Sequence, residues 1–280
     1  MHLQASVGRL AEGVVHPVTE PVLFTLDQHV ARLSLNRPER LNAMDLPLVR
    51  SVLERLSEAD KLTRDGDLRV LIISGEGDRA FSAGADMDSR RAMGRAERED
   101  HLDLIALACR EVYRFPVPVI AEINGHCIGG GAELALSCDL LFATETSGFS
   151  LPEVKLGMVA RSGGTIFARR RIPYGALAGM LFTGERVRAA EALRIGLIDE
   201  MSPSHEELAA TTEAVAMSIA CAAPSAVRAT KELLQSNSSL PIEESLRLGD
   251  RLHDTLAETA DLQEGLAALD ERRAPVFIGR

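Results

Sequence analysis

The stretch Asn124-Gly125-His126-Cys127-Ile128-Gly129-Gly130-Gly131-Ala132-Glu133-Leu134 carries three consecutive glycines where a helix is expected to begin. The first amides of a helix have no hydrogen-bond partner inside it and lie at the positive end of its dipole. Glycine leaves those amides accessible, so a negatively charged oxygen can bind there. No Gly-Lys-Ser/Thr follows, which excludes a P-loop, and the glycine spacing differs from the dinucleotide-binding fingerprint. The stretch alone predicts a generic anion site.

Outward from this turn, short apolar runs alternate with amphipathic segments. The expected strands are Val22–Thr25, Val30–Leu35, Val70–Ser74, Val119–Ile123 and Asp139–Ala143, and the expected helices include Pro47–Leu62, Ala132–Cys138, Glu185–Gly196, Ser225–Gln235 and most of Ile242–Leu269. Gly75–Asp86 is expected to be a loop. The pattern predicts an α/β body over residues 22–204, a helical segment over residues 205–280, and a loose extension over residues 1–21.

Composition excludes several classes of function. The net charge of the 280-residue chain is −10, which disfavours nucleic acid as a partner. No apolar run is long enough for a signal peptide or a membrane span, so no membrane partner is expected. The four cysteines lie far apart and form no Cys-x-x-Cys pair, so no metal site is expected. Unpaired buried thiols favour a reduced, cytoplasmic setting.

Two further loops carry candidate chemistry. Phe81-Ser82-Ala83-Gly84-Ala85-Asp86 is rich in small residues, which allow a ligand to approach the backbone closely. Glu133 lies in an otherwise apolar helix, and Glu153 follows a proline in an apolar loop. Taken singly, the first segment is equally consistent with a tight turn, and a single glutamate is more often simply solvated.

Taken together and in order, these segments closely resemble the enoyl-CoA hydratase/isomerase (crotonase) superfamily. The order is Phe81–Asp86, then Asn124–Asp139, then Phe149–Gly157, then Ser162–Thr165. Other parts agree: Leu35–Met44 resembles the coenzyme A loop of the family, and segments between Thr183 and Ile198 and between Glu264 and Phe277 resemble its later parts. The resemblance therefore covers nearly the whole chain after the extension.

The resemblance implies a crotonase-like spiral of ββα turns whose C-terminal helices make a homotrimer, or a dimer of trimers. It also implies that the backbone N–H groups of Ala85 and Gly130 form an oxyanion hole for the thioester carbonyl. Glu133 would deprotonate the attacking water and Glu153 would supply the proton to Cα. Coenzyme A belongs to the acyl-CoA substrate, and no separate cofactor is expected.

The same resemblance implies where coenzyme A binds. The expected contacts are Arg37, Pro38, Leu41, Ala83, Asp86 and Met87. Arg273 and Phe277 are expected to complete the nucleotide pocket, either from the same subunit or from a neighbouring one. Met87, Met93, Leu102 and Ile105 are candidates for an apolar acyl lining, although their helical spacing is equally typical of core residues.

One segment departs from the family pattern. Ala160 and Arg161 stand where hydratases of the family usually have proline and glycine. If Arg161 faces Glu153, it favours the ionised carboxylate; it could instead hold a polar or charged acyl group, or be a surface residue.

Both glutamates favour an enoyl-CoA hydratase. The alternatives are a dehydratase of a specialised acyl-CoA, resembling carnitinyl-CoA dehydratase, and an enoyl-CoA isomerase. A non-catalytic binder of acyl-CoA or RNA is the reading that the sequence favours least.

Overall fold

The computed structural model describes residues 20–280 and contains two β-sheets, which are surrounded by helices. All but the last two residues of the expected N-terminal extension lie outside the described residues. The larger sheet has six strands in the order β1-β2-β3-β5-β7-β10. The first pair is antiparallel and the other neighbours are parallel. Its strands are β1 (Val22–Asp27), β2 (Val30–Leu35), β3 (Val70–Gly75), β5 (Val119–Ile123), β7 (Leu140–Thr144) and β10 (Glu200–Ser202).

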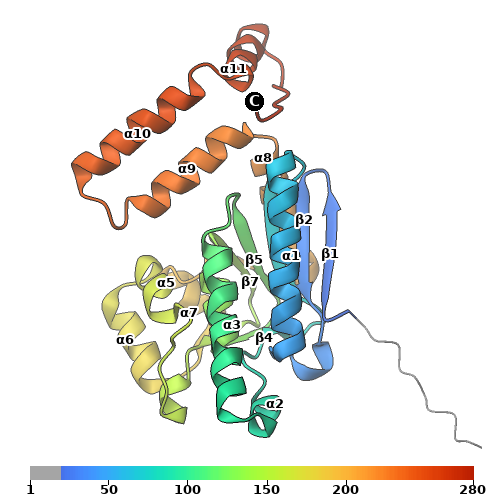
Figure 1. Cartoon of the computed structure of the whole chain (residues 1–280), viewed down its shortest axis with the longest axis vertical. Coiled ribbons are helices and arrows are strands. Elements are labelled where there is room, and N and C mark those ends of the chain that lie inside the picture. Colours follow the sequence, from blue (N-terminus) through green and yellow to red (C-terminus); the bar gives the residue numbers. More distant parts are fainter. Residues whose placement is uncertain (1–19) are drawn as a thin grey trace, which may run out of the picture.

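The inner strands β3 and β5 of the large sheet are buried at every position, as expected from their largely apolar sequences. Side chains alternate between the two faces of a strand. In β3, Leu71 and Ile73 join the main core, whereas Val70 and Ile72 join a second cluster. Helices α1 (Leu46–Asp65) and α3 (Arg95–Tyr113) cover the first face, and α8 (His205–Ala220) covers the second (Figure 1).

The smaller sheet has four short strands in the order β4-β6-β8-β9. They are β4 (Ala80–Ser82), β6 (His126–Ile128), β8 (Gly148–Ser150) and β9 (Val187–Arg188). The first three each follow a strand of the large sheet, so the chain repeats a strand, a second strand and a helix. This confirms the predicted spiral of ββα turns.

The sequence-based assignment of loops at these places was wrong. Each strand of the smaller sheet has at most three residues, which is too short for an alternating pattern to show. Their backbones approach each other closely. A Cβ added to Gly125 would lie 2.3 Å from the carbonyl oxygen of Arg79, so glycine is required there. Glu185–Gly196 is likewise helical only from Ala189 onward, since β9 precedes it.

The remaining helices near the smaller sheet are short. They are α2 (Met87–Ala92), α4 (Gly130–Leu136), α5 (Gly164–Arg171), α6 (Tyr174–Thr183) and α7 (Ala189–Ile195), with 3₁₀ turns at Pro38–Arg40 (η1) and Glu153–Leu156 (η2). In Figure 1 most of them lie at the end of the molecule opposite the C-terminal helices.

The C-terminal segment forms an arm that extends from the body (Figure 1). It contains α9 (Pro224–Ser236), α10 (Ile242–Leu256) and α11 (Ala260–Glu271). The last two divide the mostly helical stretch expected over Ile242–Leu269, because the Thr259 side chain caps a new helix by accepting from the Leu262 amide. No residue of α10 is buried. Among residues 20–280, no single helix is long and apolar enough to cross a membrane; only α8 and α9 taken together pass, and they are bent by 107°.

Candidate active site

A cavity of about 500 Å³ opens where the start of α4 meets α2, α3 and η2. It brings together seven of the residues predicted from the sequence: Ala83, Ala85, Met87, Gly130, Glu133, Glu153 and Arg161. Leu102 and Ile105 also line it, as expected, whereas Met93 does not. Within residues 20–280, no cluster of three or more His, Cys, Asp or Glu side chains is arranged to hold a metal ion.

Ala85 lines this cavity, and its backbone N–H is the first candidate donor. The neighbouring backbone is held on both sides, because the Met44 amide donates to the Gly84 carbonyl at 2.7 Å and the Asp86 amide donates to the Met44 carbonyl at 2.9 Å. No acceptor for the Ala85 N–H exists among residues 20–280. The loop therefore fixes the position of the Ala85 N–H, which has no acceptor in the described part of the chain.

Gly130 supplies a second donor beside the first. It is the first residue of α4, so its N–H has no partner within the helix. A Cβ built on Gly130 would lie 3.8 Å from the Ala85 nitrogen, which shows how close the two residues are. Gly84 makes this approach feasible: its φ is +84°, and a Cβ there would lie 2.6 Å from the Ile128 carbonyl oxygen. Two convergent backbone donors can stabilise an oxyanion.

Glu133 is the more deeply buried of the two glutamates, with 3% of its surface exposed. Its Oε1 accepts a hydrogen bond of 3.0 Å from the Gly164 amide at the start of α5. Burial raises the pKa of the Glu133 carboxyl to about 7, and the nearby negative charge of Glu153 adds to that rise, while the Gly164 bond opposes it. A carboxyl with such a pKa is suited to take up a proton near neutral pH.

Glu153 begins η2 and lies against the glycine-rich start of α4. A Cβ added to Gly129 would lie 3.2 Å from the Oε1 atom of Glu153. Its Oε2 is buried and has no hydrogen-bond partner among residues 20–280. Burial raises the pKa of Glu153. Because the two carboxyls repel each other when both are ionised, the pair tends to retain one proton.

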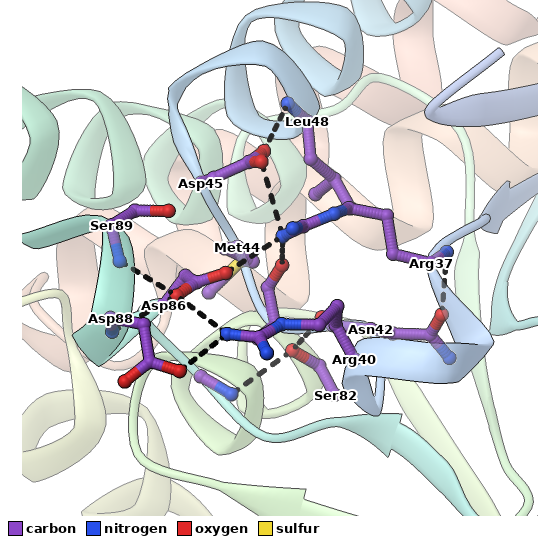
Figure 2. A network of polar contacts seen from close by, with 12 residues as sticks. Arg37, Arg40, Asn42, Met44, Asp45, Leu48, Ser82, Asp86, Asp88 and Ser89 are labelled. Atoms are coloured by element: carbon purple, nitrogen blue, oxygen red, sulfur yellow. Dashed lines mark hydrogen bonds and ion pairs between the residues drawn. The ribbon is translucent and has the colours of Figure 1, made fainter. Parts of the chain in front are cut away.

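The loop beside the cavity is held by a network of ion pairs (Figure 2). Arg37 contacts Asp86 at 3.1 Å and Asp45 at 3.2 Å, and Asp86 is 2% exposed. Asp86 also caps α2 by accepting from the amides of Asp88 and Ser89. Burial raises the pKa of Asp86, but the Ser89 amide and Arg37 outweigh that effect and leave it below its ordinary value. This network fixes the segment that carries Ala85.

Six of the residues expected to contact coenzyme A lie outside the cavity. Arg37, Pro38 and Leu41 belong to the loop around η1, and Asp86 lies beneath it with its carboxylate committed to the network. Arg273 pairs with Glu264 and Glu271 on the C-terminal arm, and Phe277 lies on the tail that follows it. Their contacts with coenzyme A stay predictions.

Arg161 lines the cavity but pairs with Asp103 of α3 at 2.5 Å. It does not lower the pKa of Glu153, which is raised by burial. A second arginine, Arg90 of α2, also lines the cavity, and sequence reasoning missed it. Arg90 is one of two adjacent arginines in the short helix α2, and no local pattern sets it apart.

Comparison with known proteins agrees with this geometry. The model of the family described as enoyl-CoA hydratase/isomerase matches residues 25–280. The chain belongs to the enoyl-CoA hydratase/isomerase family. The solved structure of an enoyl-CoA hydratase from Bacillus anthracis is similar, with a TM-score of 0.89 and 32% identity over 93% of this chain and 100% of that one.

Two curated members of the enoyl-CoA hydratase/isomerase family are similar over most of their length. The (E)-benzylidenesuccinyl-CoA hydratase of Thauera aromatica is 36% identical, over 92% of this chain and 99% of the relative. The carnitinyl-CoA dehydratase of Salmonella typhi is 34% identical, over 94% of this chain and 100% of the relative.

Proposed function

We propose that this protein is an enoyl-CoA hydratase that reversibly adds water across the Cα=Cβ bond of an enoyl-CoA thioester. One observation carries the proposal: two carboxyls with raised pKa values share a cavity with two unused backbone N–H donors. Addition of water needs a base, an acid and a site for the negative charge that develops on the thioester oxygen. The cavity contains a candidate for each.

In the proposed reaction the thioester oxygen accepts from Ala85 and Gly130. Glu133 takes a proton from water while the water oxygen bonds to Cβ. The π electrons move towards the thioester oxygen, where the two N–H groups stabilise the enolate. Glu153 then transfers its proton to Cα, and the enolate electrons form the new C–H bond. The Gly164 hydrogen bond favours the ionised form of Glu133, whereas the unpartnered Oε2 of Glu153 favours the protonated form.

The same steps in reverse give a dehydratase, which is the named activity of the Salmonella typhi relative. An isomerase would use the same oxyanion site to move the double bond without adding water. Solvent labelled with oxygen-18 distinguishes the two reactions, because only hydration incorporates the label into the product.

The proposal is tested by measuring hydration of crotonyl-CoA with wild type, Glu133→Gln and Glu153→Gln. Each variant should lose about 100-fold or more in kcat, the effect typical of removing a general acid or base. Glu258→Gln, which changes an exposed glutamate of the arm, should retain wild-type activity and serves as the control. Retention of turnover by Glu133→Gln would refute the assignment.

We also propose that the protein is a homotrimer or a dimer of trimers. The C-terminal arm exposes large apolar side chains, including Leu234 (70%), Ile242 (77%) and Leu269 (74%), which association would bury. In such an assembly Arg273 and Phe277 would reach the coenzyme A nucleotide of a neighbouring subunit. Analytical ultracentrifugation tests the assembly, and a rise in the Kd of free coenzyme A for Arg273→Ala tests the nucleotide contact.

A further inference from the structure

Arg90 lies in the cavity without an acidic partner. It belongs to α2, the helix that directly follows the segment carrying Ala85. Its Nε is buried and has no hydrogen-bond partner among residues 20–280, and no carboxylate of the described chain lies within ion-pair distance of its guanidinium. Its one side-chain hydrogen bond within residues 20–280 is a long one, from Nη1 to the Met87 sulfur at 4.0 Å. A partly buried guanidinium without an anion is costly, because it loses water and gains nothing in return.

Four other arginines around the site have carboxylate partners. Ion pairs join Arg91 and Arg40 to Asp88, Arg37 to Asp86 and Asp45, and Arg161 to Asp103. The carboxylates of Asp45, Asp86, Asp88 and Asp103 are therefore already paired. Arg90 alone among these arginines is left to meet an anion from outside the protein.

A second positively charged side chain, that of Arg98, acts on Arg90 and makes an anion there more favourable. The Arg98 Nε donates to the Arg90 carbonyl at 2.9 Å, so the two positively charged side chains lie near each other. Burial and the charge of Arg98 together lower the pKa of Arg90. A ligand anion would relieve both effects, because it would neutralise the guanidinium in a poorly hydrated place.

The position of Arg90 indicates which part of the substrate it meets. The cavity that it lines is the one holding Glu133, Glu153 and the two backbone donors, which act on the acyl group in the proposed reaction. Leu102, Ile105 and Met158 add an apolar wall suited to a short carbon chain. The arginines of the expected coenzyme A loop lie outside this cavity.

We infer that Arg90 binds a carboxylate at the far end of the acyl group, so that the preferred substrates are enoyl-CoA thioesters of dicarboxylic acids. The inference rests on the proposed function for the placement of the thioester. A guanidinium binds a carboxylate through two parallel N–H···O bonds, which gives both strength and orientation. A neutral acyl chain leaves Arg90 unpaired, and a cationic chain, such as a trimethylammonium group, is repelled.

Binding is measured first, with saturated thioesters that cannot react. Isothermal titration compares succinyl-CoA with butyryl-CoA, glutaryl-CoA with pentanoyl-CoA, and adipyl-CoA with hexanoyl-CoA. These pairs differ in the terminal carboxylate and cover three chain lengths. For at least one pair the diacid should bind wild type about 10-fold or more tightly, in line with a hydrogen-bonded charge pair. The absence of a diacid preference in all three pairs would overturn the inference.

Variants then assign the preference to Arg90. Arg90→Met keeps a long side chain without the charge and should abolish the diacid preference while leaving the neutral thioesters bound as before. Arg90→Lys should retain part of the preference. Arg91→Met changes the adjacent, exposed arginine and should behave as wild type. Loss of affinity of Arg90→Met for free coenzyme A would mean that Arg90 binds a phosphate instead, and a preference that persists in Arg90→Met would exclude Arg90 as its source.

Turnover separates this inference from the proposed hydration. Glutaconyl-CoA and pent-2-enoyl-CoA are compared as substrates, and Arg90→Met should raise KM for the diacid alone. If neither compound is hydrated while the binding preference depends on Arg90, the proposed function fails and the carboxylate site stands. If both are hydrated with equal kcat/KM and Arg90→Met changes nothing, the hydratase stands and the carboxylate site is refuted.

Discussion

Replacing Glu133 by glutamine should abolish hydration and also stabilise the fold, by an amount that grows with pH. Burial raises the pKa of Glu133 from 4.5 to about 7. Between these values the folded protein holds a proton that the unfolded chain has lost, so the stability of wild type falls as pH rises through that window. Glutamine does not titrate there, and its side-chain oxygen can still accept the Gly164 hydrogen bond.

The size of the effect follows from the two pKa values. At about 1.4 kcal/mol for each pH unit, the interval from 4.5 to about 7 corresponds to roughly 3 kcal/mol. At about pH 5 wild type has lost only the first part of this stability, and at about pH 8 it has lost nearly all of it. The free energy of unfolding of Glu133→Gln, relative to wild type, should therefore rise by about 2 kcal/mol between these conditions.

Urea denaturation at the two pH values, at one fixed protein concentration, measures this difference. Glu258→Gln provides the control, because it makes the same chemical change at an exposed position. Equal stability differences for Glu133→Gln at both pH values would show that Glu133 ionises in the folded protein as it does in the unfolded chain. Burial would then not be what makes Glu133 a proton acceptor.

Three further outcomes are expected. In a pH profile of kcat/KM for crotonyl-CoA, wild type should lose activity below about pH 7 as Glu133 becomes protonated, and a flat acidic limb would contradict this. Asp86→Asn should destabilise the protein by about 2 kcal/mol in urea denaturation, because it removes the more deeply buried of the two carboxylates that pair with Arg37; a change below about 0.5 kcal/mol would contradict it. Gly84→Ala should lower kcat, as its Cβ would lie 2.6 Å from the Ile128 carbonyl oxygen and displace the Ala85 amide; crotonyl-CoA kinetics check this, and unchanged kcat would count against the oxyanion site.

Much of the fold could be predicted from local sequence. The long strands and helices carry their own pattern, and β2 and β5 have the bounds expected from apolar runs alone. The short strands β4, β6 and β8 could not be found in this way. A segment of three residues is too short to show an alternating pattern. These segments are strands only because a neighbouring backbone pairs with them.

The candidate site, too, could be predicted only in part from the sequence. Glu133, Glu153, Ala85 and Gly130 lie within short ordered segments, so their types and spacing identified them before the structure placed them in one cavity. Their chemistry depends on small side chains and accessible amides, which are properties of the local backbone. The sequence by itself therefore determined the family and the candidate residues for its reaction.

The tertiary structure alone decided how the charges behave. Arg161 meets Asp103, which is 58 positions away in the chain, whereas Arg90 meets no acid at all within the described residues. Glu133 acquires a pKa of about 7 because the packed chain removes its water. Ionisation and ion pairing depend on exposure to solvent and on the charges nearby. Both are set by residues that are distant in the chain but close in the fold. The amino-acid sequence alone therefore could not show which arginine remains available to a substrate.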